Sequence, residues 1–157
     1  MIRPARPDDH TAIVAVTDAA FGGDEKALRI VREVEPDISL VYVEGDAIVG
    51  HTMLSRMRMG EHRPLQLSPL SVAPAHQGRG IGSALAREAL RLADAQGEPF
   101  VLVLGHSEYY PRFGFEPATP LGVLAPYDYG ESWMLARLTA WDPSLTGHVE
   151  FPAAFGE

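Results

Sequence analysis

The middle of the chain reads Leu70-Ser71-Val72-Ala73-Pro74-Ala75-His76-Gln77-Gly78-Arg79-Gly80-Ile81-Gly82-Ser83. Gly78, Gly80 and Gly82 stand where a strand ends and a helix begins, and they place no side chain between a ligand and the peptide N–H groups. Free amide donors and the positive end of the helix dipole then converge on one spot, which predicts an anion-binding loop. We expect Arg79 to add a charged contact at its rim.

Two familiar phosphate-binding loops do not fit these residues. A Walker loop requires Gly-x-x-x-x-Gly-Lys-Ser/Thr, and the segment has no lysine. A dinucleotide fingerprint requires Gly-x-Gly-x-x-Gly and an acidic residue at the end of the next strand. Here the spacing is Gly-x-Gly-x-Gly, and the next strand ends in Leu104-Gly105-His106. Both alternatives therefore fail on their residues.

Patterns outward from the loop predict an α/β fold. We expect strands at 2–5, 39–43, 47–59, 65–72, 100–104 and 133–138, helices at 10–20, 25–34 and 80–96, and a helical turn at 108–113. The long helix has an apolar stripe formed by Ile81, Leu85, Ala89, Leu92 and Ala93. The order indicates an antiparallel meander followed by a βαβ crossover, in which the strands at 65–72 and 100–104 are parallel.

Composition limits the class of protein. A chain of 157 residues fits one domain, spanning 1–157. Its net charge of −8 is unsuited to nucleic-acid binding, which requires lysine and arginine on the phosphates. No segment has the length of a signal peptide or a membrane span, so we expect a cytoplasmic protein that does not bind a membrane. The six histidines lack paired ligand spacing, so we expect no metal.

The glycine loop resembles the acyl-CoA-binding motif of the GNAT (GCN5-related) N-acetyltransferase superfamily, Gln/Arg-x-x-Gly-x-Gly/Ala, with Gln77, Gly80 and Gly82 at its three positions. The resemblance implies a GNAT-like fold, a central mixed twisted sheet flanked by helices. It also implies that the CoA pyrophosphate is held by Gln77, Gly78, Arg79, Gly80, Ile81, Gly82 and Ser83. The tail at 139–157 resembles the ending of a subgroup of small bacterial predicted acetyltransferases, and the core motifs lie within 65–116.

The strand before the loop contains Pro69, and a proline within a strand is confined to edges, starts or bulges. The sequence therefore predicts a bulge there. In the GNAT superfamily this strand splays from the next parallel strand, and the pantetheine arm lies in the gap. The resemblance implies that the backbone of Leu70, Ser71 and Val72 faces the pantetheine and the thioester. We expect the amide of Val72 to polarise the acyl carbonyl.

A second motif follows the apolar strand. Tyr110, Gly114 and Phe115 match the superfamily pattern Tyr-x-x-x-Gly-Phe, which implies that Tyr110 protonates the departing CoA thiolate. A phenol with a pKa near ~10 is protonated at neutral pH and is available as an acid. The alternative role for Tyr110 is a packed aromatic residue on a short helix. For Tyr109 we expect an adenine-side or core contact.

The sequence indicates less clearly which residues bind the acceptor amine. Glu25, His106 and Ser107 are candidates for the region near the reacting amine, but none is a clear general base. The turn-rich segment 119–132 is expected to wrap one side of the acceptor pocket, where the contacts would come from Tyr127, Asp128, Tyr129 and Glu131. In each case an ordinary surface role is the alternative.

These features lead to one functional hypothesis and two alternatives. The hypothesis is direct transfer of an acetyl group from acetyl-CoA to a primary amine of a small molecule or peptide in a ternary complex. Because the chain has no cysteine, a cysteine-linked acyl-enzyme is excluded. The alternatives are an acyl-CoA-binding regulator without transfer activity and a nucleotide-binding module unrelated to CoA. The acceptor stays open, as does assembly into a homodimer.

Overall fold

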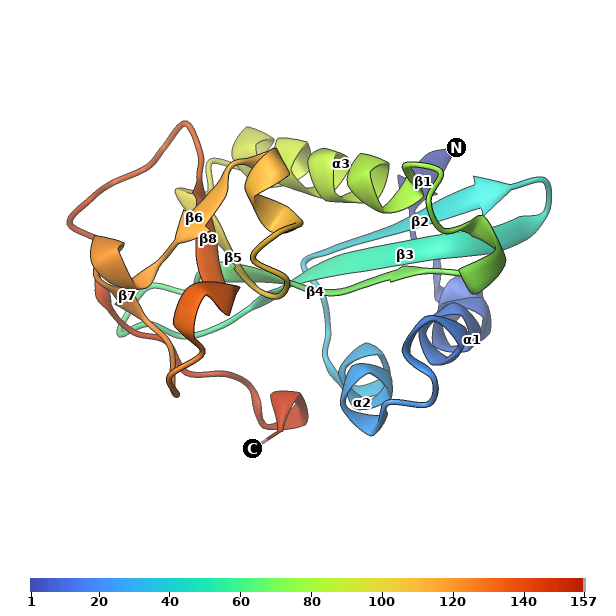
Figure 1. Ribbon diagram of the computed structural model, residues 1–157, viewed down its shortest axis with the longest axis horizontal. Coiled ribbons are helices and arrows are strands. Elements are labelled where there is room, and N and C mark those ends of the chain that lie inside the picture. The colour runs from blue at the N-terminus through green and yellow to red at the C-terminus, as the bar shows by residue number, and fades with distance from the viewer. Residues whose placement is uncertain (157) are drawn as a thin grey trace.

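The computed structural model describes residues 1–156 (Figure 1). Its main sheet has seven strands in the order β1-β2-β3-β4-β5-β8-β6. The strands are β1 (Ile2–Pro4), β2 (Ile38–Glu44), β3 (Ala47–Arg56), β4 (Leu65–Val72), β5 (Phe100–Leu104), β6 (Phe115–Pro117) and β8 (Trp133–Arg137). Only β4 and β5 pair in parallel, and every other neighbouring pair is antiparallel. The predicted α/β fold with a meander and a parallel crossover is confirmed.

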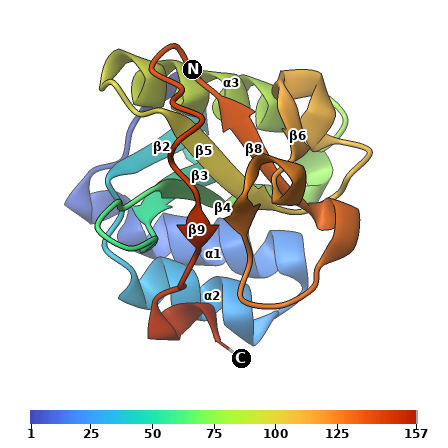
Figure 2. The same ribbon diagram turned by 90° about the vertical axis from the view of Figure 1, so that its left-hand side faces the viewer.

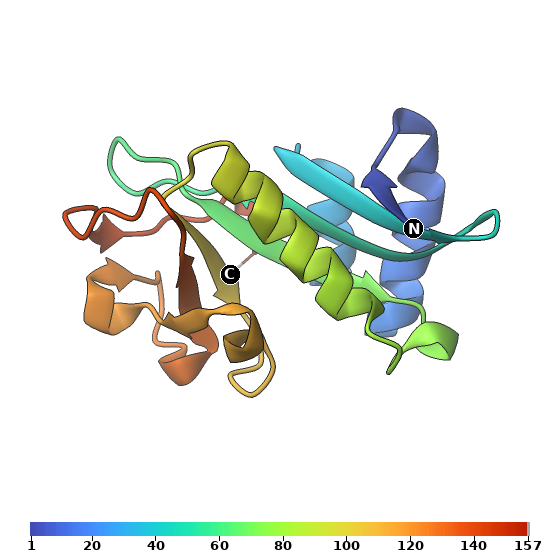
Figure 3. The same cartoon turned by 90° about the horizontal axis from the view of Figure 1, so that it is seen from above.

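Three helices cover the sheet in two layers. The helices are α1 (His10–Phe21), α2 (Glu25–Glu33) and α3 (Ile81–Ala95). Figure 2 shows α3 above the sheet and α1 and α2 below it, and Figure 3 shows α3 running obliquely across the strands. A second, parallel pair is formed by β7 (Val123–Leu124) and β9 (Gly147–His148). Each face of the sheet therefore carries its own core cluster.

The apolar stripe of α3 makes the upper core. Ile81, Leu85, Ala89 and Ala93 are buried as predicted, whereas Leu92 is only half-buried. The buried face also includes Ala86 and Leu90, which makes it wider than the predicted stripe. The helix sits close to β3 at Gly50, where an added Cβ would lie 3.0 Å from atoms of both Ile81 and Leu85. A side chain at this position would lift the helix from the sheet.

Most element boundaries lie within one residue of the prediction, and the helical turn expected from residue 108 begins at Tyr110. The strand expected to reach residue 59 ends at Arg56, because Met59 pairs with His62 in a tight turn around Gly60. Helix α1 extends one residue further than expected, to Phe21, and ends at Gly22 in the left-handed region with φ of 61°. The last two differences arise where a glycine with positive φ sets the turn.

The parallel pair in the centre of the sheet is short. Pairing runs only from Leu65 to Leu67 on β4 and from Val101 to Val103 on β5. The register with β3 then shifts, because Met53 lies opposite both Ser68 and Pro69, so the predicted bulge is present. Beyond it, β4 continues to Val72 without pairing to β5. Figure 1 shows the two halves of the sheet diverging at this point.

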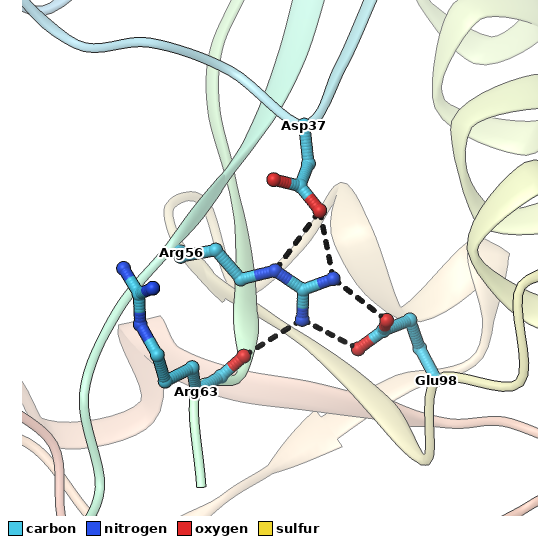
Figure 4. Close-up of polar contacts among 4 residues, drawn as sticks. All are labelled: Asp37, Arg56, Arg63 and Glu98. Atoms are coloured by element: carbon cyan, nitrogen blue, oxygen red, sulfur yellow. Dashed lines mark hydrogen bonds and ion pairs between the residues drawn. The ribbon is translucent and has the colours of Figure 1, made fainter.

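The closed end of this split is held by Arg56 (Figure 4). Its guanidinium donates to Asp37 at 2.7 and 3.0 Å, to Glu98 at 2.8 and 2.9 Å, and to the carbonyl oxygen of Arg63 at 2.8 Å. Arg63 precedes β4 and Glu98 precedes β5. One side chain therefore ties together the segments that lead into the two parallel strands.

Candidate active site

A cleft of about 820 Å³ opens at the split between β4 and β5. Most of the residues singled out from the sequence line it: Leu70, Val72, Gln77, Gly78, Gly80, Ile81, Gly82, Ser83 and Tyr110. Two do not. Ser71 is fully buried within the sheet, opposite His51 of β3, and Arg79 turns away from the cleft. The split thus brings the glycine loop, the end of β4 and Tyr110 to one cavity.

The glycine loop leaves the first turn of α3 open to a ligand. Gly78 and Gly80 adopt φ of 77° and 83°, a left-handed conformation that favours glycine. Gly80 is the N-cap residue of α3, and no side chain caps the helix. The unpaired N–H groups and the positive end of the helix dipole therefore face outward together. This arrangement suits a phosphate or pyrophosphate group.

Gly82 serves a different purpose, because it lies inside the helix. A Cβ there would lie 3.1 Å from the hydroxyl of Tyr109 and 3.5 Å from Val72 Cγ2. The hydroxyl of Tyr109 also lies 3.4 Å from Ser83 Oγ. Gly82 thus allows Tyr109 to reach the start of α3 and allows the helix to approach the end of β4.

The polar side chains of the loop hold it in place. The side-chain Nε2 of Gln77 donates to the carbonyl oxygen of Val72 at 3.0 Å, which fastens the loop to the strand. Arg79 forms two hydrogen bonds with Glu44, at 3.1 and 3.2 Å, and thereby links the loop to the end of β2. The guanidinium expected at the anion site is therefore engaged elsewhere.

Tyr110 is held edge-on by a group of aromatic rings. Its ring centroid lies 5.1 Å from that of Tyr109 and 5.6 Å from that of Phe115. A Cβ on Gly105 would collide with Tyr110 Cε2, so the ring rests directly on the backbone after β5. Burial and the neighbouring Tyr109 raise the pKa of Tyr110 to about 12. Within residues 1–156 its hydroxyl has no hydrogen-bond partner, and the residue lines the cleft as a protonated phenol.

The cleft continues to the opposite face of the sheet. There it is lined by Gln66 of β4, by Ala27 and Ile30 of α2, and by Phe155 near the C-terminus. The segment around Phe155 is held against α2, because Arg29 Nε donates to the carbonyl oxygen of Ala154 at 2.8 Å. No sequence motif indicates these residues, since only the folded chain places them on one cavity.

Arg112 is a further cation in the cleft that no sequence motif indicates. Arg112 lines the cleft, with its guanidinium carbon 4.5 Å from the ring centroid of Tyr109. Its Nε donates to the carbonyl oxygen of Tyr109 at 2.8 Å, which leaves the rest of the guanidinium available to an anion. Its position two residues after Tyr110 was the only available signal.

Several residues expected near the acceptor lie elsewhere. Glu25 is exposed and does not line the cleft, and Ser107 is also absent from its walls. His106 does line it, as an exposed residue after β5. The segment 119–132 does not contribute, so none of its four suggested contacts, Tyr127, Asp128, Tyr129 and Glu131, borders the cavity. No group of three or more metal-ligating side chains occurs among residues 1–156.

Fold and cleft together show the features that characterise the GNAT superfamily: a split parallel pair, a bulged strand and an open helix start. A family model described as an acetyltransferase (GNAT) domain matches residues 1–118. The chain therefore belongs to the GNAT acetyltransferase family and is an enzyme of the acetyltransferase class. In the part of the chain that the structure describes, no helix has the length and apolar character to cross a membrane.

Relatives and solved structures agree with this assignment. The uncharacterized N-acetyltransferase YjhQ of Escherichia coli K12 is 38% identical over 155 residues, which covers 90% of this chain and 86% of the relative. A GNAT family acetyltransferase from Brucella melitensis, crystallised with acetyl-CoA, is 31% identical with a TM-score of 0.81, covering 99% of this chain and 97% of that one. The E. coli YhbS complex with CoA shares the fold, with a TM-score of 0.90 at 24% identity and coverage of 100% and 92%.

Proposed function

We propose that the protein transfers an acetyl group from acetyl-CoA to a primary amine by direct attack in a ternary complex. The observation that carries the proposal is the split between β4 and β5, which leaves one edge of β4 unpaired beside an uncapped helix start. The similar Brucella protein was crystallised with acetyl-CoA, which supports the same donor here. The amine approaches from the α1–α2 side, where the same cleft continues.

The donor side fits the parts of acetyl-CoA. The first turn of α3, with Gly78 and Gly80 free of side chains, binds the pyrophosphate through backbone N–H groups. The edge of β4 from Leu70 to Val72 that faces away from β3 bonds to the pantetheine arm, and the Val72 amide polarises the acyl carbonyl. Arg112 supplies positive charge along the same wall.

Tyr110 acts as the acid that protonates the leaving sulfur. A pKa of about 12 keeps the phenol protonated across the working pH range, and its hydroxyl has no competing partner among the described residues. The CoA sulfur leaves more readily when a proton is delivered to it as the carbon–sulfur bond breaks. Such proton transfer contributes roughly 10²- to 10⁴-fold in rate.

The test is the variant Tyr110→Phe, assayed by thiol release with a panel of amines. We expect kcat to fall by roughly 10²-fold or more, while the thermal shift produced by acetyl-CoA stays as in the wild type. Tyr127→Phe is the matched control, because Tyr127 is 55% exposed and lies outside the cleft. Unchanged turnover in Tyr110→Phe would remove its acid role. Binding of acetyl-CoA by the wild type without thiol release from any amine would instead favour a regulator.

A further inference from the structure

Gln66 lies on β4 at the closed end of the split and is only 2% exposed, yet it lines the cleft. Its register partner on β5, Leu102, belongs to the core cluster that also contains Ile30 of α2. The next residue, Leu67, packs in the cluster on the α3 side. Because alternate residues of a strand point to opposite faces, the Gln66 side chain faces α2 and the acceptor end of the cleft.

The amide of Gln66 is unsatisfied. Its oxygen is buried without a hydrogen-bond partner, and no donor in residues 1–156 reaches it, including Ser55, which lies directly opposite on β3. Ser55 Oγ is itself buried and unpaired. A buried carbonyl oxygen without a donor is unfavourable, and such groups in folded proteins are nearly always paired. The position of Gln66 in the cleft indicates that a bound ligand supplies the missing donor.

The buried walls on the α2 side of the cleft are apolar, and the charged residues of that side, Asp24 and Lys26, lie nearer the surface. Ala27 and Ile30 of α2 and Phe155 form the walls of this end of the cleft. Among the described residues that line the cleft, Asp24 is the only carboxylate. It is exposed at the start of α2, where it accepts the N–H of Lys26 at 2.8 Å and caps the helix. Among the described residues, the buried part of this wall therefore carries the amide of Gln66 and no carboxylate.

We propose that Gln66 is an acceptor-binding residue and that the cleft selects a primary amine on an apolar stem, bound in its neutral form. The inference rests on the proposed function and names the acceptor class for the same site. The carbonyl oxygen of Gln66 accepts one N–H of the amine, and the lone pair is left free to face the thioester. The apolar walls favour the neutral amine, because burial disfavours the ammonium ion.

The transfer then balances without a carboxylate base. The nitrogen lone pair forms a bond to the acyl carbon as the carbon–sulfur bond breaks, and Tyr110 gives its proton to the sulfur. The nitrogen loses one proton, which returns to the Tyr110 phenolate through solvent in the cleft. Because the amine enters neutral, the products are an amide and a free thiol, with no net proton released.

The first test is Gln66→Leu, which keeps the size of the side chain and removes the carbonyl. We expect KM for the amine to rise about tenfold, the size of one lost hydrogen bond to a bound ligand, with the dissociation constant of acetyl-CoA unchanged. Gln96→Leu is the matched control, because Gln96 is exposed at the end of α3. Unchanged amine KM in Gln66→Leu would overturn the role of Gln66.

The second test is the pH profile of kcat/KM with two amines of different solution pKa. In the wild type the acid limb should move with the pKa of the amine, because the free amine is the reacting form. Gln66→Glu introduces an ionisable group and should add a second inflection to that limb. An acid limb that is identical for both amines would reveal a protein base and would contradict neutral-amine binding.

Two different results would contradict the transfer reaction and the role of Gln66. Wild-type protein that binds acetyl-CoA but releases no thiol with any amine contradicts the transfer reaction, and with it the acceptor class. Wild-type turnover combined with an unaffected Gln66→Leu variant leaves the reaction standing and overturns only the assignment of Gln66.

Discussion

At the scale of single residues, the site depends on close contacts at glycines and on one buried polar side chain. Tyr110 rests on Gly105, Tyr109 approaches Gly82, and Gln66 is buried without a partner. The motifs around Tyr110 and the glycine loop are visible in the sequence, because each is a local run of residues. The position of Gln66 is not, because it results from pairing with strands that are distant in the chain.

Gly105→Ala tests whether the packing of Tyr110 on the backbone positions its hydroxyl. The added methyl group would collide with the Tyr110 ring and must displace it. We expect kcat to fall by roughly tenfold or more, as a small misplacement of an acid does, with acetyl-CoA affinity nearly retained. Steady-state kinetics of thiol release and calorimetric titration with acetyl-CoA measure the two effects. Equal kcat in the variant and the wild type would show that the contact does not position the phenol.

His51 should make stability depend on pH. Its ring is buried in the sheet, with Nε2 3.1 Å from Ser39 Oγ, and burial lowers its pKa from 6.5 to about 4. Between these pH values the unfolded chain binds more protons than the folded chain. The stability that comes from burying His51 in its neutral form is therefore intact above pH 6.5 and is lost as the pH falls toward 4. The loss corresponds to about 3 kcal/mol.

Urea unfolding at several pH values measures this effect. The free energy of unfolding should decline more steeply between pH 6.5 and 4 in the wild type than in His51→Gln. The exposed His148 provides the control variant His148→Gln, which should keep the wild-type slope. Parallel curves for wild type and His51→Gln would show that His51 is not held neutral.

At the scale of elements, long periodic segments were predictable and short ones were not. The bounds of β4 and β5 match the prediction, because β5 is a continuous apolar run, β4 alternates apolar and polar residues, and each lies beside a clear turn or loop signal. The two- and three-residue strands β6, β7 and β9 have too few residues to show a period. The pairing of Arg79 with Glu44 was also hidden, since it joins the glycine loop to the end of β2, 35 residues away in the chain.

Arg56→Met tests the link between the segments that lead into β4 and β5. Methionine keeps the apolar stem but leaves the carboxylates of Asp37 and Glu98 without their shared partner. We expect a loss of roughly 2–4 kcal/mol, seen as a fall in Tm of roughly 5–15 °C. Arg56→Lys should recover only part of it, because lysine lacks the planar fork that contacts both acids. A change in Tm of under about 2 °C for Arg56→Met would contradict the link.

At the scale of the whole molecule, the split between β4 and β5 forms one cleft that connects the two faces of the sheet. The α3 face carries the open helix start and Tyr110, and the α1–α2 face carries Gln66 and Phe155. Donor and acceptor would therefore meet at the bulge from opposite sides. The family and its co-substrate were predictable from the sequence, whereas the α2 end of the cleft required the fold, because its walls come from α2, β4 and the C-terminal segment.

A crystal structure of the protein with CoA tests this central claim most directly. We expect the pyrophosphate at the first turn of α3, the pantetheine along the unpaired edge of β4, and the sulfur within hydrogen-bond reach of the Tyr110 hydroxyl, directly or through one water. CoA bound outside the split, or a sulfur far from Tyr110 with its proton path blocked, would contradict the account.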